Sequence, residues 1–268
     1  MSDNYMVKFG NLTNPSVNIL KEIKTIKSLG FDFAEIGIEA SEDMPEILMK
    51  QKNEIITLLQ RFNAPAIAHT AWYIELGTIY SGVRDAWLHE CKKAIDITYI
   101  LGIKKINFHT HARGLFNKKA KKTLLDNYVE SMRELVAYAK KYEIKVMIEN
   151  GAEKGEIRLY PDIKFILKNV PEVGFHLDVG HAYINGGINT IEGYINKFGD
   201  RIEHIHMHDN HGKSDEHLPI GKGNINYKKV IKLLKQINYD KTITIEVFTS
   251  KNDAIKSMNK IKRMWNEI

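Results

Sequence analysis

IEHIHMH, residues 202–208, is the stretch that decides the fold. Its histidines stand at every second position from His204, and Ile205 and Met207 fill the positions between them. Successive side chains of a β-strand point to opposite faces, so the stretch predicts a strand with one apolar face and one imidazole face. The apolar face can pack under helices while the polar face points into a closed sheet, and this division favours a barrel.

The rest of the chain repeats this unit. Seven more short runs are predicted as strands: YMVKF (5–9), FAEIGI (33–38), APAIAH (64–69), IKKINFH (103–109), IKVMIE (144–149), VGFHLD (173–178) and TITIEV (242–247). Segments with helical period follow them, at 15–30, 45–62, 82–102, 121–142, 161–169, 190–199, 227–237 and 253–265. Strict alternation predicts a parallel sheet. Eight pairs match a single-domain (β/α)8 TIM barrel over residues 1–268, with a doubly wound open sheet as the alternative.

The composition is that of a soluble globular protein, since 43% of the 268 residues are hydrophobic and 27% are charged. No run resembles a signal peptide or a membrane span, and the lone Cys91 suits a reducing compartment. We therefore expect a cytoplasmic protein with no membrane partner. The net charge of +6 is a mild bias towards anionic partners, although lysines on helical segments such as residues 117–122 usually just keep a helix face solvated.

The predicted strand ends deliver side chains that bind metals or move protons. Active sites of (β/α)8 barrels lie at the carboxyl ends of the strands, and six strands end inward on an imidazole or a carboxylate. These six residues are His69, His109, Glu149, Asp178, His206 and Glu246. Three more residues of the same kinds follow strand ends closely: His181, Asp215 and His217. The sequence thus predicts that nine such groups meet at one barrel mouth.

Such a cluster predicts bound cations. Crowded carboxylates repel one another, and their desolvation costs several kcal/mol each unless cations offset it. Imidazole with carboxylate ligands suits Zn²⁺, with Mn²⁺ or iron as alternatives. Nine ligands are too many for one ion, and Glu149 could bridge two, so we expect a site for up to three divalent metal ions.

Each of these positions can also be interpreted without a metal, as a residue that only supports the fold. A single histidine at a strand end often only packs, and Asp178 is placed to cap a helix. We assign His89 and His111 no role in the site. Four other histidines are interpreted as supporting or structural groups: His176, His204, His208 and His211. The prediction of a metal site depends on convergence, because no single position is decisive.

Seven stretches between His69 and Phe248 also carry a family resemblance: AHTAWYIELG, INFHTHARG, VMIENGA, HLDVGHAY, HIHMHDN, DEHLPIGKGNI and TITIEVF. In their order and their places at strand ends they resemble the xylose isomerase-like TIM barrels. That superfamily includes endonuclease IV, of the AP endonuclease family 2, and the sugar-phosphate isomerases and epimerases.

The two branches of this superfamily imply different metal sites. Resemblance to endonuclease IV implies three zinc ions, one on His69 and His109, one on Asp178, His206 and Glu246, with Glu149 bridging these two, and one on His181, Asp215 and His217. Resemblance to the ketose epimerases implies a single ion on Glu149, Asp178, His206 and Glu246. It also implies that both glutamates exchange the substrate proton and that His181 contacts the substrate.

Two functions follow from these alternatives. A sugar or sugar-phosphate isomerase or epimerase would use the metal to acidify a C–H beside a carbonyl, and Glu149 and Glu246 would move the proton. A phosphodiesterase acting at abasic sites in DNA would use clustered ions to attack a phosphate. Residues 39–46, EASEDMPE, favour the isomerase, because an acidic loop repels the phosphates of a DNA backbone.

Five residues near the predicted mouth are candidates for binding the substrate: Trp72, Tyr73, Arg113, Lys213 and Lys222. The two aromatic residues could shape a sugar pocket or, under the nuclease alternative, stack against DNA. The three cations could hold a phosphate group on a small substrate. We expect a small-molecule sugar or sugar phosphate as the partner, and the oligomeric state is not readable from the sequence.

Overall fold

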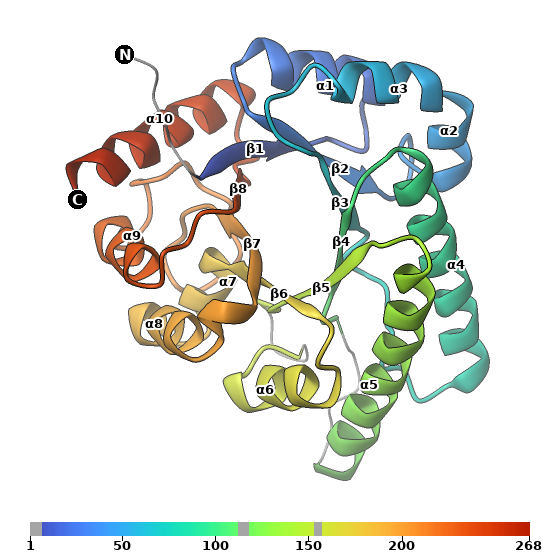
Figure 1. The fold of residues 1–268 in the computed structure, drawn as a ribbon. Coiled ribbons are helices and arrows are strands. Elements are labelled where there is room, and N and C mark those ends of the chain that lie inside the picture. The colour runs from blue at the N-terminus through green and yellow to red at the C-terminus, as the bar shows by residue number, and fades with distance from the viewer. Residues whose placement is uncertain (1–6, 112–117, 153–156) are drawn as a thin grey trace.

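Eight parallel strands close into a barrel with helices around the outside (Figure 1). The structure is a computed structural model, and it describes residues 7–111, 118–152 and 157–268. The strands are β1 Lys8–Leu12, β2 Phe33–Ile38, β3 Ile67–Thr70, β4 Lys105–His109, β5 Lys145–Glu149, β6 Gly174–Asp178, β7 Ile202–Met207 and β8 Thr242–Ile245. Each strand pairs with its sequence neighbours and β8 pairs with β1. The predicted single-domain (β/α)8 TIM barrel is confirmed, and the open sheet is excluded.

The helices cover the outer face of the barrel. They are α1 Ile19–Ser28, α2 Pro45–Lys50, α3 Lys52–Leu59, α4 Ser81–Ile100, α5 Lys118–Lys140, α6 Tyr160–Asn169, α7 Val179–Ile184, α8 Gly187–Phe198, α9 Tyr227–Gln236 and α10 Lys251–Glu267, with a 3-10 turn at Gly199–Arg201. No helix in the described part of the chain is both long and apolar enough to cross a membrane.

Several predicted bounds differ from the observed ones by a few residues, and two of the differences have a clear structural reason. The segment 45–62 forms two helices, because Gln51 between them has a φ of −110° and a ψ of 11°, outside the helical range. The first strand begins at Lys8 and runs to Leu12, beyond the predicted stretch 5–9, of which residues 5 and 6 lie outside the described residues. β1 continues as far as Leu12 because this residue still pairs with β2, where it is opposite Glu35.

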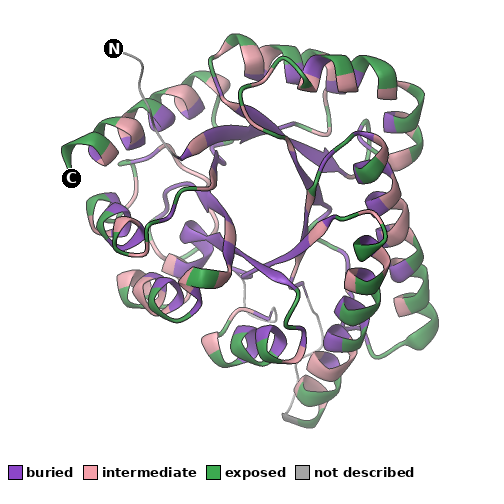
Figure 2. Ribbon diagram, in the orientation of Figure 1, coloured by how far each residue is buried: buried purple, intermediate pink, exposed green. Residues whose placement is uncertain are grey.

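Burial follows the layers of a barrel (Figure 2). The main apolar core lies between the strands and the inner faces of the helices, whose outer faces are exposed. Inside the barrel a smaller apolar cluster is formed by Phe33, Ile67 and Met147. Side chains two residues further along a strand lie on the same face, so these three are followed towards the mouth by Glu35, His69 and Glu149. The lumen is therefore apolar below and polar towards the carboxyl ends of the strands.

The register of neighbouring strands brings the polar residues side by side. His109 is opposite Glu149, and Asp178 is opposite His206. Glu149 is also opposite His176 on β6. Closure of the sheet thus gathers groups that are far apart in the sequence.

Candidate metal centre

A cavity of about 810 Å³ opens at the carboxyl ends of the strands. Seven of the nine predicted ligands line it: His69, His109, Glu149, His181, Asp215, His217 and Glu246. The other two, Asp178 and His206, are fully buried and contact this set from below. The structure therefore brings all nine residues together at one mouth, in overlapping groups whose ligand atoms lie close enough to share ions.

The deepest group surrounds one nitrogen of His206. Its Nδ1 lies 3.1 Å from Glu246 Oε2, 3.8 Å from Asp178 Oδ2 and 3.9 Å from Glu149 Oε1. His206 Nδ1, Asp178 Oδ2 and Glu246 Oε2 are buried and have no hydrogen-bond partner. A buried polar atom without a partner costs about 1–3 kcal/mol. A cation placed among these atoms would satisfy all of them, so the donor set fits a divalent metal ion.

Glu35 on β2 orients His206, and sequence reasoning missed it. Its fully buried carboxylate accepts a hydrogen bond from His206 Nε2 at 2.9 Å and lies 3.2 Å from His204 Nε2. Burial opposes its ionisation, but His206 and His204 outweigh burial and hold the pKa of Glu35 well below its usual range. With Nε2 donating its hydrogen, Nδ1 presents a lone pair to the group above, as metal-binding imidazoles do.

A second group adjoins the first through Glu149. Its Oε2 lies 3.4 Å from His69 Nε2 and 3.5 Å from His109 Nδ1, and it accepts a hydrogen bond of 2.6 Å from Asn107 Nδ2. Burial lowers the pKa of His109 to about 4 despite the nearby carboxylate. His109 is therefore a neutral imidazole at pH 7, the form that ligates metals.

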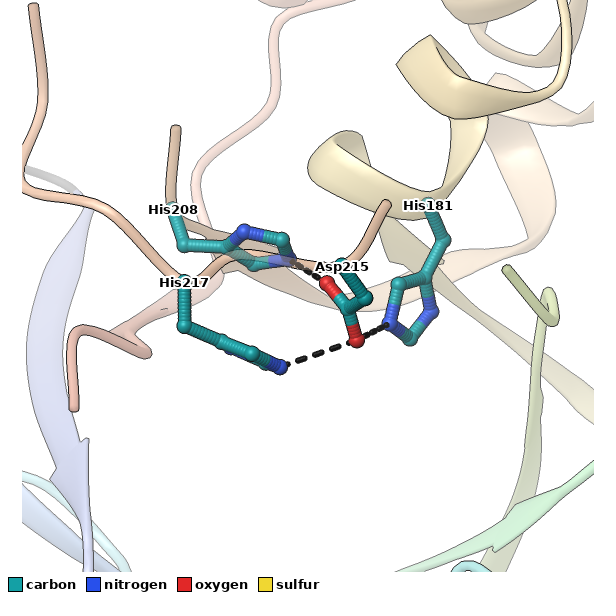
Figure 3. A group of neighbouring side chains, drawn as sticks. All are labelled: His181, His208, Asp215 and His217. Carbon is teal, nitrogen blue, oxygen red and sulfur yellow. Dashed lines mark hydrogen bonds and ion pairs between the residues drawn. The ribbon is translucent and has the colours of Figure 1, made fainter. Parts of the chain in front are cut away.

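The third group contains His181, Asp215 and His217, and the structure adds His208 to it (Figure 3). Asp215 Oδ2 lies 3.1 Å from His181 Nε2 and 2.9 Å from His217 Nε2. His208 Nε2 approaches the other oxygen, Oδ1, at 3.4 Å. Three imidazoles thus converge on one carboxylate (Figure 3).

Asp178 caps a helix and is also placed to act as a metal ligand. Its Oδ1 accepts a hydrogen bond of 2.6 Å from the backbone N–H of His181, and so caps the N-terminus of α7. Its Oδ2 is left free to face His206. Capping fixes the position of the carboxylate, and the fixed carboxylate then helps to form the deepest group.

Of the four predicted substrate-binding residues that the structure describes, one lines the cavity. Trp72 lines the cavity and is 52% exposed. Its ring packs edge-on against that of His111, which lines the cavity although it was given no role in the site. Tyr73, Lys213 and Lys222 do not line this cavity. Arg113 lies outside the described residues.

Two further residues line the cavity that were not predicted from the sequence as part of the site. Phe248 lines the mouth and stacks on His217, with ring centroids 4.2 Å apart. Lys251 also lines the cavity, and its Nζ contacts Asn11 Oδ1 at 2.8 Å and Glu22 Oε2 at 2.9 Å. The lysine and its partners lie at opposite ends of the chain, so no local sequence pattern predicts the contact.

The chain matches the xylose isomerase-like TIM barrel family over residues 23–264. An uncharacterised protein of Methanocaldococcus jannaschii is 28% identical over 265 residues, which are 96% of this chain and 88% of that protein. The L-ribulose 3-epimerase of a Methylomonas species is 25% identical over 259 residues, 92% and 85% of the two chains. A probable endonuclease 4 of Campylobacter hominis is 27% identical over 194 residues, 65% of this chain and 67% of that one.

Solved structures agree with these similarities. A D-tagatose 3-epimerase-like protein superposes with a TM-score of 0.85 and 28% identity over 97% of this chain and 98% of that one. The IolI protein, solved with a bound zinc atom, superposes with a TM-score of 0.81 over 97% and 98% of the two chains. At 18% identity, this second likeness shows the fold alone.

Proposed function

The chain belongs to the xylose isomerase-like TIM barrel family, and from this premise we propose that it is a metal-dependent sugar isomerase or epimerase. The observation that carries the proposal is the group around His206 Nδ1, where an imidazole and three carboxylates converge with buried atoms unpaired. Relatives described as L-ribulose 3-epimerase and D-tagatose 3-epimerase-like protein support a sugar as the substrate.

Four residues would hold the catalytic cation: Glu149, Asp178, His206 and Glu246. Three carboxylates and one imidazole suit Zn²⁺ or Mn²⁺, with iron as a further alternative. When bound, such an ion polarises a carbonyl and the adjacent hydroxyl and so makes the C–H beside the carbonyl more acidic.

The proton is moved by the two glutamates that line the cavity, Glu149 and Glu246. Burial raises the pKa of Glu246, but His206 and His217 outweigh it and lower this pKa to about 2. Glu246 is therefore ionised at neutral pH and can accept a proton. In an epimerase one carboxylate removes the proton from one face of the carbon and the other returns a proton to the opposite face. Trp72 and Phe248 offer apolar walls to the sugar.

The described residues that line the cavity favour an uncharged ketose over a sugar phosphate. Among the described residues that line it, Lys251 is the only lysine or arginine. Its Nζ contacts Asn11 Oδ1, the Leu12 carbonyl and Glu22 Oε2. An ammonium has three hydrogens, so these partners occupy it and leave no donor for a phosphate.

Exchange with heavy water tests the proposal. Metal-reconstituted protein is incubated in D₂O with a panel of ketoses and their phosphates, and deuterium at the carbon beside the carbonyl is followed by NMR. We expect one ketose to take up deuterium, and Glu149→Gln or Glu246→Gln to slow this uptake by about 10²–10⁴-fold. His89→Asn, on the exposed face of α4 away from the cavity, is the matched control and should keep the wild-type rate.

A phosphodiesterase acting at abasic sites is the second candidate. The similarity to a probable endonuclease 4 and the three adjoining groups favour it, whereas Glu39 of the acidic loop lines the cavity and disfavours it. A duplex with one abasic site forms the second arm of the same assay. Cleavage of this duplex that Glu149→Gln abolishes, with no deuterium uptake by any sugar, would replace the first proposal with the second.

A further inference from the structure

The end of the barrel where the strands begin, opposite the cavity, carries a concentration of positive charge. Lys105 and Lys145 are the first residues of β4 and β5, and they are opposite each other in register. Lys241 immediately precedes β8, and Arg201 immediately precedes β7. Closure of the parallel sheet therefore brings four cations from distant parts of the sequence to one end of the molecule. We call these four residues the basic cluster.

A single carboxylate lies among these cations. Glu203 Oε2 is 3.0 Å from Lys105 Nζ, and Glu203 Oε1 is 3.0 Å from Lys241 Nζ. Lys145 lies on another side of the same carboxylate. A Cβ added to Gly174 would be 2.7 Å from Glu203 Cγ and 3.2 Å from Lys145 Cε, so the glycine leaves the room that these two side chains share.

A bulge in β7 places Glu203 in this position. Phe175 of β6 is opposite Ile202, whereas the next residue, His176, is opposite His204. Glu203 is therefore the extra residue of β7, and a bulge turns such a residue away from the regular alternation of a strand. The carboxylate is thus directed at the basic cluster by the backbone itself.

The carboxylate does not balance the cations. Within this group of five residues, four cations face one carboxylate, which leaves three positive charges in excess. Burial, together with the three other cations, outweighs Glu203 and lowers the pKa of Lys145. The protonated lysine is therefore held where positive charge is unfavourable, and an anion bound beside it would remove that cost.

The three lysines still have hydrogens to donate. An ammonium has three. Lys105 donates to the carbonyl oxygen and to Oε2 of Glu203, and Lys241 donates to a backbone carbonyl and to Glu203 Oε1. Lys145 donates only to a backbone carbonyl. One hydrogen of Lys105, one of Lys241 and two of Lys145 are thus left without an acceptor among the described residues.

We propose that the basic cluster binds a phosphate-type oxyanion, either free phosphate or the phosphate group of a monoester, at the end of the barrel opposite the candidate metal centre. Such a group carries close to two negative charges at pH 7 and accepts several charge-assisted hydrogen bonds at once. A carboxylate ligand would offset only one of the excess charges. The side chains of Lys105 and Lys241 are 28% and 34% exposed, so an anion can reach them from solvent.

The bound anion would stabilise the barrel. It would link the starts of β4, β5 and β8, which carry Lys105, Lys145 and Lys241. A ligand that binds only the folded chain raises the free energy of unfolding. This role is separate from the proposed sugar chemistry, because none of the four cations lines the cavity.

Binding of inorganic phosphate tests the proposal without any enzymatic turnover. Isothermal titration calorimetry measures the affinity of the wild type, Lys145→Met and the control Lys104→Met. The control removes the same charge from a neighbouring position, but the Lys104 side chain is exposed and pairs with Glu143. We expect Lys145→Met to bind phosphate about 10–100-fold more weakly, and the control to match the wild type. Equal affinity in all three proteins, or no binding by the wild type, would overturn the proposal.

Replacing the carboxylate gives a result that damage to the fold cannot imitate. Glu203→Gln keeps the four cations and removes the negative charge that competes with the ligand, so its affinity for phosphate should rise about 5-fold. Phosphate should also raise its unfolding temperature more than that of the wild type, relative to chloride at the same ionic strength. The general effect of salt acts on both proteins alike. A lower affinity in Glu203→Gln would contradict the proposal.

Glycerol 3-phosphate distinguishes the two sources of the phosphate group. A site for free phosphate should bind this monoester more weakly than inorganic phosphate, and a site for a monoester should bind it more tightly. Each titration is repeated with Lys145→Met, because a ligand bound at the barrel mouth would not respond to this change. Binding of both ligands that Lys145→Met leaves unaltered would place them elsewhere and overturn the assignment.

Discussion

At the scale of single residues, three imidazoles of the candidate metal centre are oriented by a partner of the ring nitrogen that faces away from it. Glu35 holds His206, and two backbone carbonyls hold His181 and His217. Such partners fix the tautomer and the direction of the ligand. The chemistry of the mouth therefore depends also on groups behind the candidate ligands, such as the buried carboxylate of Glu35.

Replacing Glu35 tests this dependence. Glu35→Gln keeps an acceptor for His206 Nε2 but removes the negative charge. We expect affinity for the cation at Glu149, Asp178, His206 and Glu246 to fall about 10–100-fold. Competition with a zinc chelator measures the change.

Thr242→Val is the matched control, because it removes the hydroxyl that faces His204 Nδ1 and leaves the bond between Glu35 and His206 intact. Its zinc affinity should stay close to that of the wild type. Equal losses in both variants would show that the barrel lumen, rather than the Glu35 carboxylate, determines the affinity.

The sequence predicted the nine groups that meet at the mouth, six at strand ends and three just after them, but not the residues that support them. The two-residue period of a β-strand predicts which face of the sheet a side chain occupies. This is enough to place the carboxylates of Glu149 and Glu246 inside the barrel. It does not tell which ring nitrogen of a histidine faces which neighbour. Glu35 meets its imidazole partners across 169 and 171 positions of sequence, and only closure of the barrel sets that pairing.

At the scale of elements, the short helix α7 links two of the groups. Asp178 caps its first turn and faces the deepest group, and His181 enters the third group one turn later. One turn of helix thus places two candidate ligands, Asp178 and His181, in adjoining groups. Sequence analysis did not predict α7, because a six-residue helix is too short to show a helical period.

Gly180→Ala tests the packing of α7 against His208. In most helices this change stabilises, but here the new methyl group would meet the imidazole ring. We expect the variant to unfold at a lower temperature than the wild type and to lose one Zn²⁺ per chain. Thermal unfolding and zinc content measure the two effects.

A double variant separates the clash from other effects. In a His208→Ala background the ring is absent, so Gly180→Ala should no longer destabilise and should recover the ordinary preference of helices for alanine. If Gly180→Ala destabilised both backgrounds equally, contact with His208 would not be the reason for glycine at this position.

At the scale of the whole molecule, closure of the sheet gathers the residues of the proposed metal site at one mouth. The alternation of strands and helices was sufficient to predict the barrel, because eight such pairs in a chain of this length have few other arrangements. The walls of the mouth were harder to predict. Lys213 and Lys222 are near the ligands in sequence but do not line the cavity, whereas Lys251 reaches it from the start of α10.

The acidic loop after β2 makes stability depend on pH. Asp43 is fully buried, and burial raises its pKa from 3.8 to about 7. Because the folded pKa exceeds the unfolded one, this group favours the fold below pH 3.8, and that contribution is lost as the pH rises to about 7.

Asp43→Asn should remove the loss of stability that ionisation of Asp43 causes as the pH rises. We expect the variant to be more stable than the wild type above pH 7, by up to about 4 kcal/mol, since one pKa unit corresponds to about 1.4 kcal/mol. The difference should disappear towards pH 4. Urea unfolding of both proteins between pH 4 and pH 9 measures it, and a difference that does not vary with pH would contradict the burial of an ionisable carboxyl here.

The central claim is that the barrel gathers distant imidazoles and carboxylates around shared cations. Anomalous X-ray diffraction from crystals grown with zinc tests it most directly, because the anomalous signal locates each ion without reference to activity. We predict one peak bounded by Glu149, Asp178, His206 Nδ1 and Glu246, and a second bounded by His181, His208, Asp215 and His217. A mouth that contains no peak at saturating zinc would contradict the account.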